Sequence, residues 1–314
     1  EWGTFDVDCV AVDWGVLVGL PEFNHRNGRG VLYGELPEHG RLTGYAKATR
    51  RNDHDALYLS FTEWDVLTAP TWVGLDNYRR FFENPLYLKT LWNTLRFALM
   101  LVPLGMLAAL GMALALNQNI RLRGIYRVIF FLPVLTMPVA IAVVWKWIYA
   151  PDFGLINQAL ALVNGPRIKW LSDVKTAMFS LVLMSIWMGS GYGMVIYLAG
   201  LQNISRSYYE AAQVDGASGW QQFVHITLPL LTPTIFFSLV TSTISAFQVF
   251  DIVYVMTKGG PLDSTRTMVY TIYDDGFHFF RMGGASATAW VLFAIILAIT
   301  VVQLWGQQRW VHYD

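Results

Sequence analysis

The sequence predicts an all-α integral membrane protein with five transmembrane helices. Hydrophobic residues make up 54% of the chain and charged residues only 14%, whereas a soluble domain carries about 25% charged residues. Five continuous apolar runs are long enough to cross a bilayer, which takes roughly 20 helical residues. A transmembrane barrel would need short strands of alternating hydrophobicity, so the continuous runs favour helices.

The five predicted spans follow one another along the chain after residue 96. They cover residues 97–116, 128–149, 177–201, 228–250 and 285–305. In the second span, Pro133 and Pro138 predict a kink, because proline removes an amide donor from the helix. Arg96, Lys146 and Asp251 lie near span ends, where long polar side chains reach the membrane interface.

Four connections join the predicted spans. Residues 117–127 carry three arginines, and residues 150–176 are rich in turn-forming residues. Residues 202–227 hold a polar motif, and residues 251–284 begin with a polar turn around Gly259 and Gly260. Cytoplasmic loops carry an excess of Lys and Arg, but basic residues here have nearly equal densities on both sides. Charge alone therefore does not orient the chain.

Residues 1–55 differ from the rest of the chain in composition. They are rich in Gly, Asp, Arg and His, and their longest apolar patch, residues 10–20, is interrupted by Asp13. That patch is too short to span a bilayer. The start is acidic, with Glu1, Asp6 and Asp8, unlike the basic start of a signal peptide.

The composition also excludes several classes of function. The single cysteine, Cys9, allows no intrachain disulfide and no multi-cysteine metal site, and the six histidines are scattered. A net charge of zero gives no basic field for nucleic acid. The GxxxxGK[ST] phosphate loop, HExxH and GxSxG are all absent. We therefore expect no enzyme, no metal and no cofactor in this chain, and any nucleotide to be bound by another subunit.

The polar stretch at residues 209–229 lies between two apolar spans and reads YEAAQVDGASGWQQFVHITLP. Gly216 is expected where two short helices meet, because a residue with positive φ lets a helix stop and the chain turn. Ser207 with Glu210, and Ser218 with Gln221, each have the spacing of a capping box. The stretch therefore predicts a helix, a glycine turn and a second helix at the membrane surface.

The motif has features of a protein-docking surface and of a helix start. Small side chains at Ala211 and Ala212 let a partner backbone approach closely, and Glu210 and Asp215 offer charge to basic residues of a partner. Pro229 falls near the start of the next transmembrane helix, where a missing amide hydrogen is tolerated. An amphipathic surface helix with incidental Glu and Gly is the alternative interpretation.

The Glu210-Ala211-Ala212, Gly216 and Ile226-Thr227-Leu228-Pro229 pattern resembles the EAA loop of binding-protein-dependent ABC transporter permeases. From about Ala56 onward, the chain is similar to the carbohydrate-type subunits of that family, the maltose and glycerol-phosphate kind. Seven further stretches match in the family's order. These are Ser60-Phe61-Thr62-Glu63-Trp64, Val73-Gly74-Leu75-Asp76-Asn77-Tyr78, Asn93-Thr94, Pro151 with Gly154 and Asn157, Ala199-Gly200-Leu201-Gln202, Thr257-Lys258-Gly259-Gly260-Pro261 and Ala285-Ser286-Ala287.

The resemblance implies an ABC importer permease-type helical bundle over residues 56–314, in the plasma (inner) membrane of a bacterium or archaeon. It places the loop at residues 202–229 in the cytoplasm, where it seats in a cleft of a separate ATPase subunit that binds the ATP. The implied partners are two copies of that ATPase, a second homologous permease subunit and an extracytoplasmic solute-binding protein. The residues implied in ATPase coupling are Glu210, Ala211, Ala212, Asp215, Gly216, Ile226, Leu228 and Pro229.

The resemblance also raises a question about residues 1–55. Permeases of this kind usually have six core helices, and the first lies directly before the stretch that matches at Ser60. That helix is absent here, and residues 57–61 resemble its tail. Residues 1–55 are either a frame-shifted or otherwise aberrant N terminus or a genuine soluble extension. Resequencing the gene upstream of Ala56 would distinguish the two.

Polar side chains in the fourth span mark a candidate translocation path. Ser238, Ser242, Ser245 and Gln248 recur at steps of four and three, so they share one face of a helix. Polar side chains that face lipid are costly, so this stripe should face the interior of the bundle. It lines a sugar-sized cavity or it hydrogen-bonds neighbouring helices, and both interpretations stay open.

The third span offers a similar choice. Trp187 and Tyr192 are candidate path residues, because aromatic faces stack on the CH surfaces of sugars. Gly189 and Gly193, however, have the GxxxG spacing of close helix packing, and Gly105 with Ala109 has the same character.

Two other functions stay open on the sequence alone. One is an ABC permease for amino acids or peptides. The other is a secondary transporter driven by an ion gradient, which would favour carboxylates inside the spans, and the span interiors hold none. The sequence does not name the solute or the partner permease.

Overall fold

The computed structural model describes residues 56–118 and 121–311. These residues are almost entirely helical, with one antiparallel hairpin of β1 (Thr62–Glu63) and β2 (Thr71–Trp72). The all-α membrane fold is therefore confirmed. Residues 1–55 lie outside the described residues, so the two explanations for them remain predictions.

Four helical segments in the described residues are long and apolar enough to cross a membrane. They are α4 (Pro85–Asn117), α8 (Ala177–Asn203), α12 (Thr232–Phe247) with α13 (Asp251–Met256), and α15 (Met282–Gln307). α4 begins well before the predicted residue 97. The Asn84 side chain accepts a hydrogen bond from the Leu86 amide, and Pro85 occupies the first turn, so the helix starts at a well-formed cap.

The second predicted span, residues 128–149, is not one continuous helix. α5 (Arg123–Phe131) leads into a 3₁₀ turn at Leu132–Leu135, and α6 (Pro138–Ile148) leaves at 100° to it. Met137 is extended, with a ψ of 124°, because the ring of a following proline disfavours the helical conformation. The kink predicted from Pro133 and Pro138 is therefore a full corner, and the pair provides a fifth span only if both halves count together.

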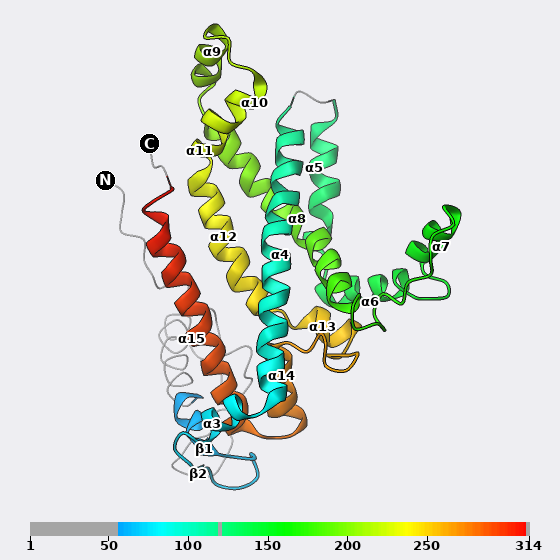
Figure 1. The fold of residues 1–314 in the computed structure, drawn as a ribbon, viewed down its shortest axis with the longest axis vertical. Helices are drawn as coiled ribbons and strands as arrows, with labels where there is room; N and C mark the ends of the chain where they lie inside the picture. The colour runs from blue at the N-terminus through cyan, green and yellow to red at the C-terminus, as the bar shows by residue number, and fades with distance from the viewer. Residues whose placement is uncertain (1–55, 119–120, 312–314) are drawn as a thin grey trace, which may run out of the picture.

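The most extensive helix–helix interface in the described residues lies between α4 and α8, and α12 packs against both helices (Figure 1). Gly193 of α8 lies against Ala109 of α4, where a Cβ on the glycine would lie 2.8 Å from the Cβ of Ala109. Around this contact, Ala113, Leu116 and Met194 are buried with their neighbours. The packing interpretation of Gly193 and Ala109 therefore describes what these two residues do here.

Gly191 is expected to be intolerant of even a methyl group. A Cβ at this position would lie 2.1 Å from the carbonyl oxygen of Phe130, so Gly191→Ala must push α5 away from α8. We expect a loss of about 1–3 kcal/mol, seen as a lower melting temperature of the purified protein. Gly189→Ala is the control, since nothing lies within 4 Å of its Cβ position. Equal melting of the two variants would contradict this packing.

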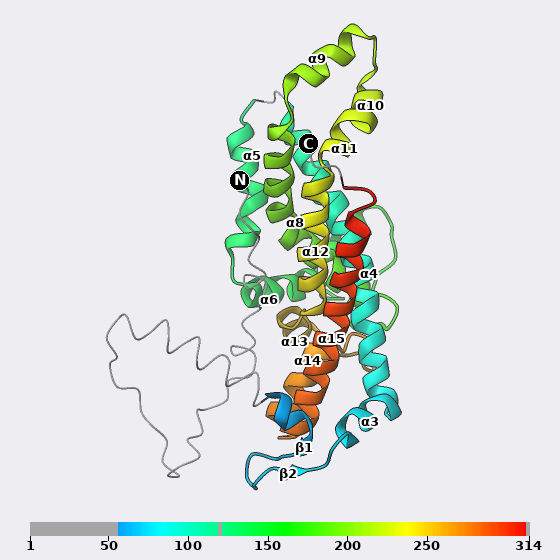
Figure 2. The ribbon, with the colours of Figure 1, turned by 90° about the vertical axis from the view of Figure 1, so that its left-hand side faces the viewer.

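The two ends of the bundle carry different elements. α9 (Arg206–Val214) and α10 (Gly219–Gln222) project at one end, beside the connection from α4 to α5 and the C-terminal end of α15 (Figures 1 and 2). We call this the loop end. β1, β2 and α3 (Asp76–Glu83) lie at the opposite, hairpin end. The end of α4 and the start of α5 therefore lie at the same end of the bundle as the loop at residues 202–229, which is expected in the cytoplasm.

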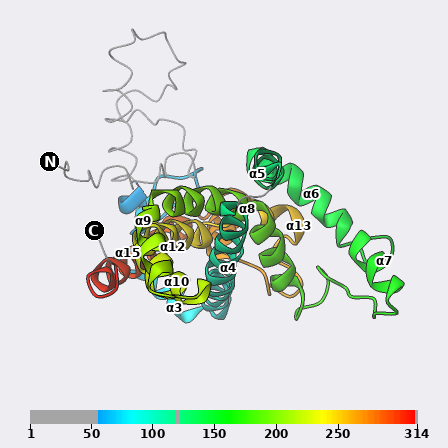
Figure 3. The same ribbon diagram turned by 90° about the horizontal axis from the view of Figure 1, so that it is seen from above.

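The remaining helices lie toward the side and the hairpin end. α7 (Leu155–Leu162) follows α6 and extends away from the bundle (Figure 3). α14 (Met268–Tyr273) continues into a π-helical turn, Asp274–His278, that leads to α15. α14 and this turn lie between the end of the fourth span, at α13, and the fifth span, α15.

Candidate functional site

The loop at residues 202–229 forms a projecting arm at the loop end. α9 runs outward, the chain turns at residues 215–218, and α10 leads back through a π-helical turn (Phe223–Thr227) and α11 (Leu228–Leu230) into α12 (Figure 1). The sequence predicted this order of helix, glycine turn and helix, and the structure has it.

Gly216 ends α9 with a positive φ of 78°. Its amide donates to the carbonyl of Gln213 at 3.1 Å, and the Ala217 amide donates to the carbonyl of Ala212 at 2.9 Å. This pair of bonds is a Schellman termination, which satisfies carbonyls that the helix end would leave free. The turn is therefore built by the local backbone and needs a residue that accepts positive φ.

The cap of α10 follows the prediction, and the cap of α9 does not. The Ser218 amide donates to Oε1 of Gln221 at 2.7 Å, and the Gln221 amide donates to Oγ of Ser218 at 3.4 Å. This is a complete capping box. The box expected from Ser207 and Glu210 was wrong: α9 begins at Arg206, so Ser205 is its cap and accepts from the Ser207 amide at 3.3 Å.

Two contacts bring the two ends of the arm together at its base. The Tyr209 hydroxyl and Oγ1 of Thr227 are 2.9 Å apart, which ties α9 to the π-helical turn that leads back into α12. Gly200, near the end of α8, lies against Leu231 and Thr234, whose atoms would be 2.8 and 2.6 Å from a Cβ there. The two ends of the arm therefore meet closely at the start of α12.

The predicted coupling residues fall into two groups on this arm. Glu210, Ala211, Asp215 and Gly216 are exposed near the tip, with Ala212 partly buried among them. Leu228 is exposed at the base, where Ile226 and Pro229 are half-buried. The tip group therefore lies on α9 and the turn that follows it, and the base group lies where the chain leads into α12.

Sequence analysis missed the apolar surface of the arm. Val214 is 89% exposed and Trp220 72% exposed, and neither α9 nor α10 has a buried residue. Large apolar side chains gathered on a projecting element mark an interaction surface. The signal was present as an apolar residue at position 214 and a tryptophan at position 220 inside a polar motif.

The polar stripe of the fourth span divides in the structure. Ser238 is buried and interacts with the Tyr197 hydroxyl of α8, whereas Ser245 is exposed and Ser242 is half-buried. α12 ends at Phe247, so Gln248 lies in the break before α13, where its buried Nε2 has no hydrogen-bond partner within the described chain. Ser238 thus has a helix-packing contact, and Ser245 is the exposed member of the stripe.

The aromatic candidates of the third span have exposed side chains. Trp187 is 46% and Tyr192 53% exposed, and the Trp187 ring lies 5.5 Å from that of Trp145 in α6. Gly189 has open space around it, unlike Gly193. Close packing and exposed rings therefore coexist on α8, on different faces.

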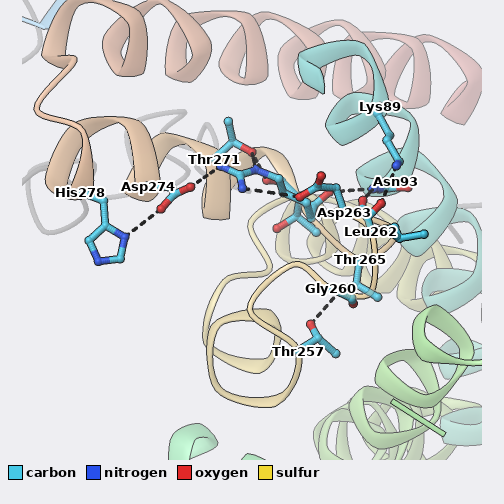
Figure 4. Close-up of polar contacts among 12 residues, drawn as sticks. Lys89, Asn93, Thr257, Gly260, Leu262, Asp263, Thr265, Thr271, Asp274 and His278 are labelled. Carbon is cyan, nitrogen blue, oxygen red and sulfur yellow. Dashed lines mark hydrogen bonds and ion pairs between the residues drawn. The ribbon is translucent and has the colours of Figure 1, made fainter. Parts of the chain in front are cut away.

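A polar network at the hairpin end was not predicted. The connection at residues 257–267 folds against α4, where the Lys89 ammonium donates to the Leu262 carbonyl at 2.6 Å (Figure 4). The Asn93 amide donates to the carbonyls of Asp263 and Arg266, at 2.7 and 3.0 Å. Sequence analysis noted the Gly-Gly-Pro turn, but partners about 170 residues away carry no local signal.

Arg266 forms the buried centre of this network. Its side chain is 12% exposed and pairs with Asp274, which is 10% exposed. The Arg266 guanidinium also donates to Oγ1 of Thr271 at 3.1 Å, and Nδ1 of His278 lies 2.9 Å from the Asp274 carboxylate (Figure 4). The pair fixes α14 and the π-helical turn to the connection that precedes them.

Asp275, next in the chain, has a different environment. It is 4% exposed, and the Tyr87 hydroxyl donates to its carboxylate at 2.7 Å. Burial raises the pKa of Asp275, and the Tyr87 hydrogen bond offsets part of that rise. Because the folded chain then keeps this proton to higher pH than the unfolded chain, the free energy of unfolding falls as pH rises from about 3.9 through the raised value.

Asp275→Asn is therefore expected to leave the protein as stable as, or more stable than, the parent at pH 7. The amide oxygen still accepts from Tyr87, and no charge is buried. The difference in melting temperature should shrink as the pH approaches 3, where the parent carboxyl is protonated. Asp274→Asn is the matched control and should lose stability, because it weakens the pair with Arg266. Equal losses in both variants would refute the distinction.

Comparisons with known proteins point to one family. The family of the binding-protein-dependent transport system inner membrane component matches residues 102–311. "Probable ABC transporter permease protein YesP" of Bacillus subtilis (strain 168) is 43% identical over 264 residues, covering 82% of this chain and 85% of that protein. "sn-glycerol-3-phosphate transport system permease protein UgpA" of Pectobacterium atrosepticum is 35% identical over 261 residues, covering 82% and 88%.

A solved structure agrees with the fold. The crystal structure of a bacterial ABC transporter involved in the import of the acidic polysaccharide alginate has a TM-score of 0.76 at 23% identity, covering 86% of this chain and 94% of that chain. The spans of the structure and these comparisons indicate the same family. The chain belongs to the family of binding-protein-dependent transport system inner membrane components, the multi-pass permease subunits of ABC importers, and it is a transporter subunit and not an enzyme.

Proposed function

We propose that this chain forms the translocation path for a sugar or sugar-like solute and couples to a separate ATPase through the arm at residues 202–229. The observation that carries the coupling is the exposure of two large apolar side chains on the arm, Val214 at the end of α9 and Trp220 in α10. A membrane subunit gains nothing from two such side chains in water. A partner that covers them would recover the free energy of burial.

The arm is suited to transmit force. The Schellman turn at Gly216 and the capping box at Ser218 fix the angle between α9 and α10. The Tyr209–Thr227 bond joins the two sides of the arm, and the contact of Gly200 with Leu231 joins the two spans to which the arm is connected. Movement of the tip would therefore move α8 and α12 together, and these two helices carry the candidate path residues.

The surface of the tip also fits a protein partner with a basic rim. Glu210 and Asp215 are exposed beside the small side chains of Ala211 and Ala212. Exposed carboxylates around an apolar centre steer and orient an oppositely charged partner. The base residues Ile226, Leu228 and Pro229 would then transmit the motion into α12.

For the path itself, we propose the outer polar residues of α12, the glutamine in the break that follows it, and the exposed rings of α8. Ser242, Ser245 and Gln248 offer hydrogen bonds, and Trp187 and Tyr192 offer flat faces, which is the combination that sugars need. Exposed polar side chains in an apolar span are costly against lipid, so a cavity or a second permease subunit should cover them. Ser238 is the member of the stripe that packs against a neighbouring helix, at Tyr197 of α8.

The carbohydrate class has support from relatives. The name of UgpA gives its solute as sn-glycerol 3-phosphate, and the solved transporter is involved in the import of alginate. Both solutes are sugar or polyol derivatives. The working assembly would contain this chain, a second homologous permease, two ATPase subunits and an extracytoplasmic solute-binding protein.

The test is reconstitution of this assembly in vesicles, with uptake of a panel of mono- and disaccharides and sn-glycerol 3-phosphate. We expect accumulation of one panel member that needs ATP, the ATPase and the binding protein. Uptake driven by a proton or sodium gradient without the ATPase would replace this proposal by a secondary transporter. ATP-dependent uptake of amino acids or peptides alone would leave the coupling in place and refute the carbohydrate class.

A further inference from the structure

We propose that Phe250, Tyr254, Tyr273 and Phe277 form an aromatic track that binds sugar rings between the hairpin end and the polar stripe of α12. The inference rests on the proposed carbohydrate function and deepens it by naming where the solute is bound on its way into the span. None of these four residues was among the candidates from sequence analysis.

The four rings form a continuous chain across three elements. The Phe250 ring lies 5.4 Å from that of Tyr254 in α13 and 5.0 Å from that of Tyr273 in α14. Tyr254 and Tyr273 are 5.3 Å apart, and Tyr273 lies 5.5 Å from Phe277 in the π-helical turn. All of these centroid distances fall within the range of direct ring contact.

The track runs from the hydrophobic core to the surface. α13 buries Ile252, Val253 and Met256 in the core beside α6, and Phe250 packs against the same core. Tyr273 is half-buried, whereas Tyr254 and Phe277 are each 37% exposed. The protein therefore holds two large rings at its surface, joined through Tyr273 to a ring that is anchored in the core.

The inner end of the track meets the break between α12 and α13. Gln248 lies two residues before Phe250, and its buried Nε2 has no partner in the described chain. Ser245, one turn earlier, is exposed. A solute that leaves the rings would meet the exposed Ser245 hydroxyl, a group that binds sugar hydroxyls, next to the buried amide of Gln248.

The rings also combine the two chemistries that sugars need. Ring faces stack on the CH surfaces of a pyranose, and the rings of Tyr254 and Tyr273, 5.3 Å apart, each carry a hydroxyl. A phenolic hydroxyl can both donate a hydrogen bond to a sugar and accept one from it. A row of similar rings gives successive sites of similar strength, so a solute can move along it without being held.

Aromatic residues also gather at membrane interfaces as lipid-facing belts, and labelling of single cysteines separates the two cases. Cys9 is replaced by Ser, and cysteines are placed one at a time at Tyr254, Tyr273 and Phe277 in the full assembly. Spheroplasts are treated with the membrane-impermeant 2-(trimethylammonium)ethyl methanethiosulfonate, at rest and during turnover. Only a thiol that ionises in water reacts fast.

The control is Trp92→Cys. Trp92 is 60% exposed on α4, one residue before Asn93, which bonds the connection at the hairpin end. We expect the three track positions to label several-fold faster than the control, at rest or during turnover. Labelling no faster than Trp92→Cys would place the rings against lipid and overturn the proposal. Labelling needs no knowledge of the solute, so this failure is distinct from failure of ATP-driven sugar uptake.

The ring itself is tested at Tyr273, with the panel sugar that the parent assembly accumulates. Tyr273→Phe keeps the stacking face and should retain most uptake. Tyr273→Ala should raise the KM for uptake several-fold while the assembly still copurifies with its ATPase. Parent-like KM in Tyr273→Ala would overturn the track, and equal losses in Phe and Ala variants would assign the effect to the hydroxyl and contradict stacking.

Discussion

Replacement of Gly216 by proline is expected to abolish ATP-driven uptake while the chain still inserts into the membrane. Proline fixes φ near −65°, and the turn needs +78°. The variant also loses the amide that donates to the Gln213 carbonyl. Without this termination α9 cannot turn into α10, so the tip of the arm no longer presents Val214 and Trp220 together. Uptake in vesicles and the amount of chain in the membrane fraction are the two measurements.

Milder changes at the same position supply the controls. No atom lies within 4 Å of a Cβ at Gly216, so Gly216→Ala suffers only from the backbone conformation, at roughly 1–2 kcal/mol. Gly216→Asn should suffer least, because asparagine tolerates this conformation. Uptake should therefore decline from Gly to Asn to Ala to Pro. Full uptake by the proline variant would mean that the hinge does not transmit the ATPase motion.

Removal of the Arg266 side chain is expected to cause the largest loss of stability. Arg266→Ala leaves the Asp274 carboxylate, 10% exposed, without its main counter-charge. Breaking a buried ion pair by removing one partner costs about 3–5 kcal/mol. The melting temperature of the purified protein should fall by several degrees. The connection at residues 257–267 should become sensitive to protease, because the lost side chain also pairs with Asp263 and donates to Thr271.

Two further variants test the cause of this loss. Arg266→Met combined with Asp274→Leu removes both charges, so it should be less damaging than Arg266→Ala alone. Arg79→Ala removes an exposed pair with Glu83, whose side chains are 73% and 61% exposed, and should not change the melting temperature measurably. A double variant as unstable as the single one would show that packing, and not the unpaired charge, dominates.

Local rules explain how much of the arm the sequence could predict. A glycine followed by a serine cap and a glutamine at the third helical position specifies a turn and a new helix within seven residues, and each partner lies within five residues of the other. The cap of α9 was misplaced by two residues for the same reason. Ser205 and Ser207 are both capable caps, and only the direction of the chain leaving α8 selects between them.

The corner between α5 and α6 shows where local rules stop. Pro133 and Pro138 predict a disturbed helix, but a kink and a 100° corner have the same sequence. The corner depends on the segments against which α5 and α6 each pack. Gly191 of α8 accepts the backbone of Phe130 on one side, and α13 packs against α6 on the other. These contacts join residues more than 60 positions apart.

The sequence by itself determined the helical membrane fold, the number of apolar segments, the family and the construction of the arm. The family follows from the resemblance of its motifs. The other three follow from hydrophobic length, from proline and glycine positions and from hydrogen bonds between near neighbours. Only the tertiary structure decided that Ser238 packs while Ser245 is exposed, that Arg266 is buried against Asp274, and that rings from α13, α14 and the π-helical turn meet. Each of these depends on which distant segments lie together, and a helical period alone cannot specify the neighbour that a face will meet.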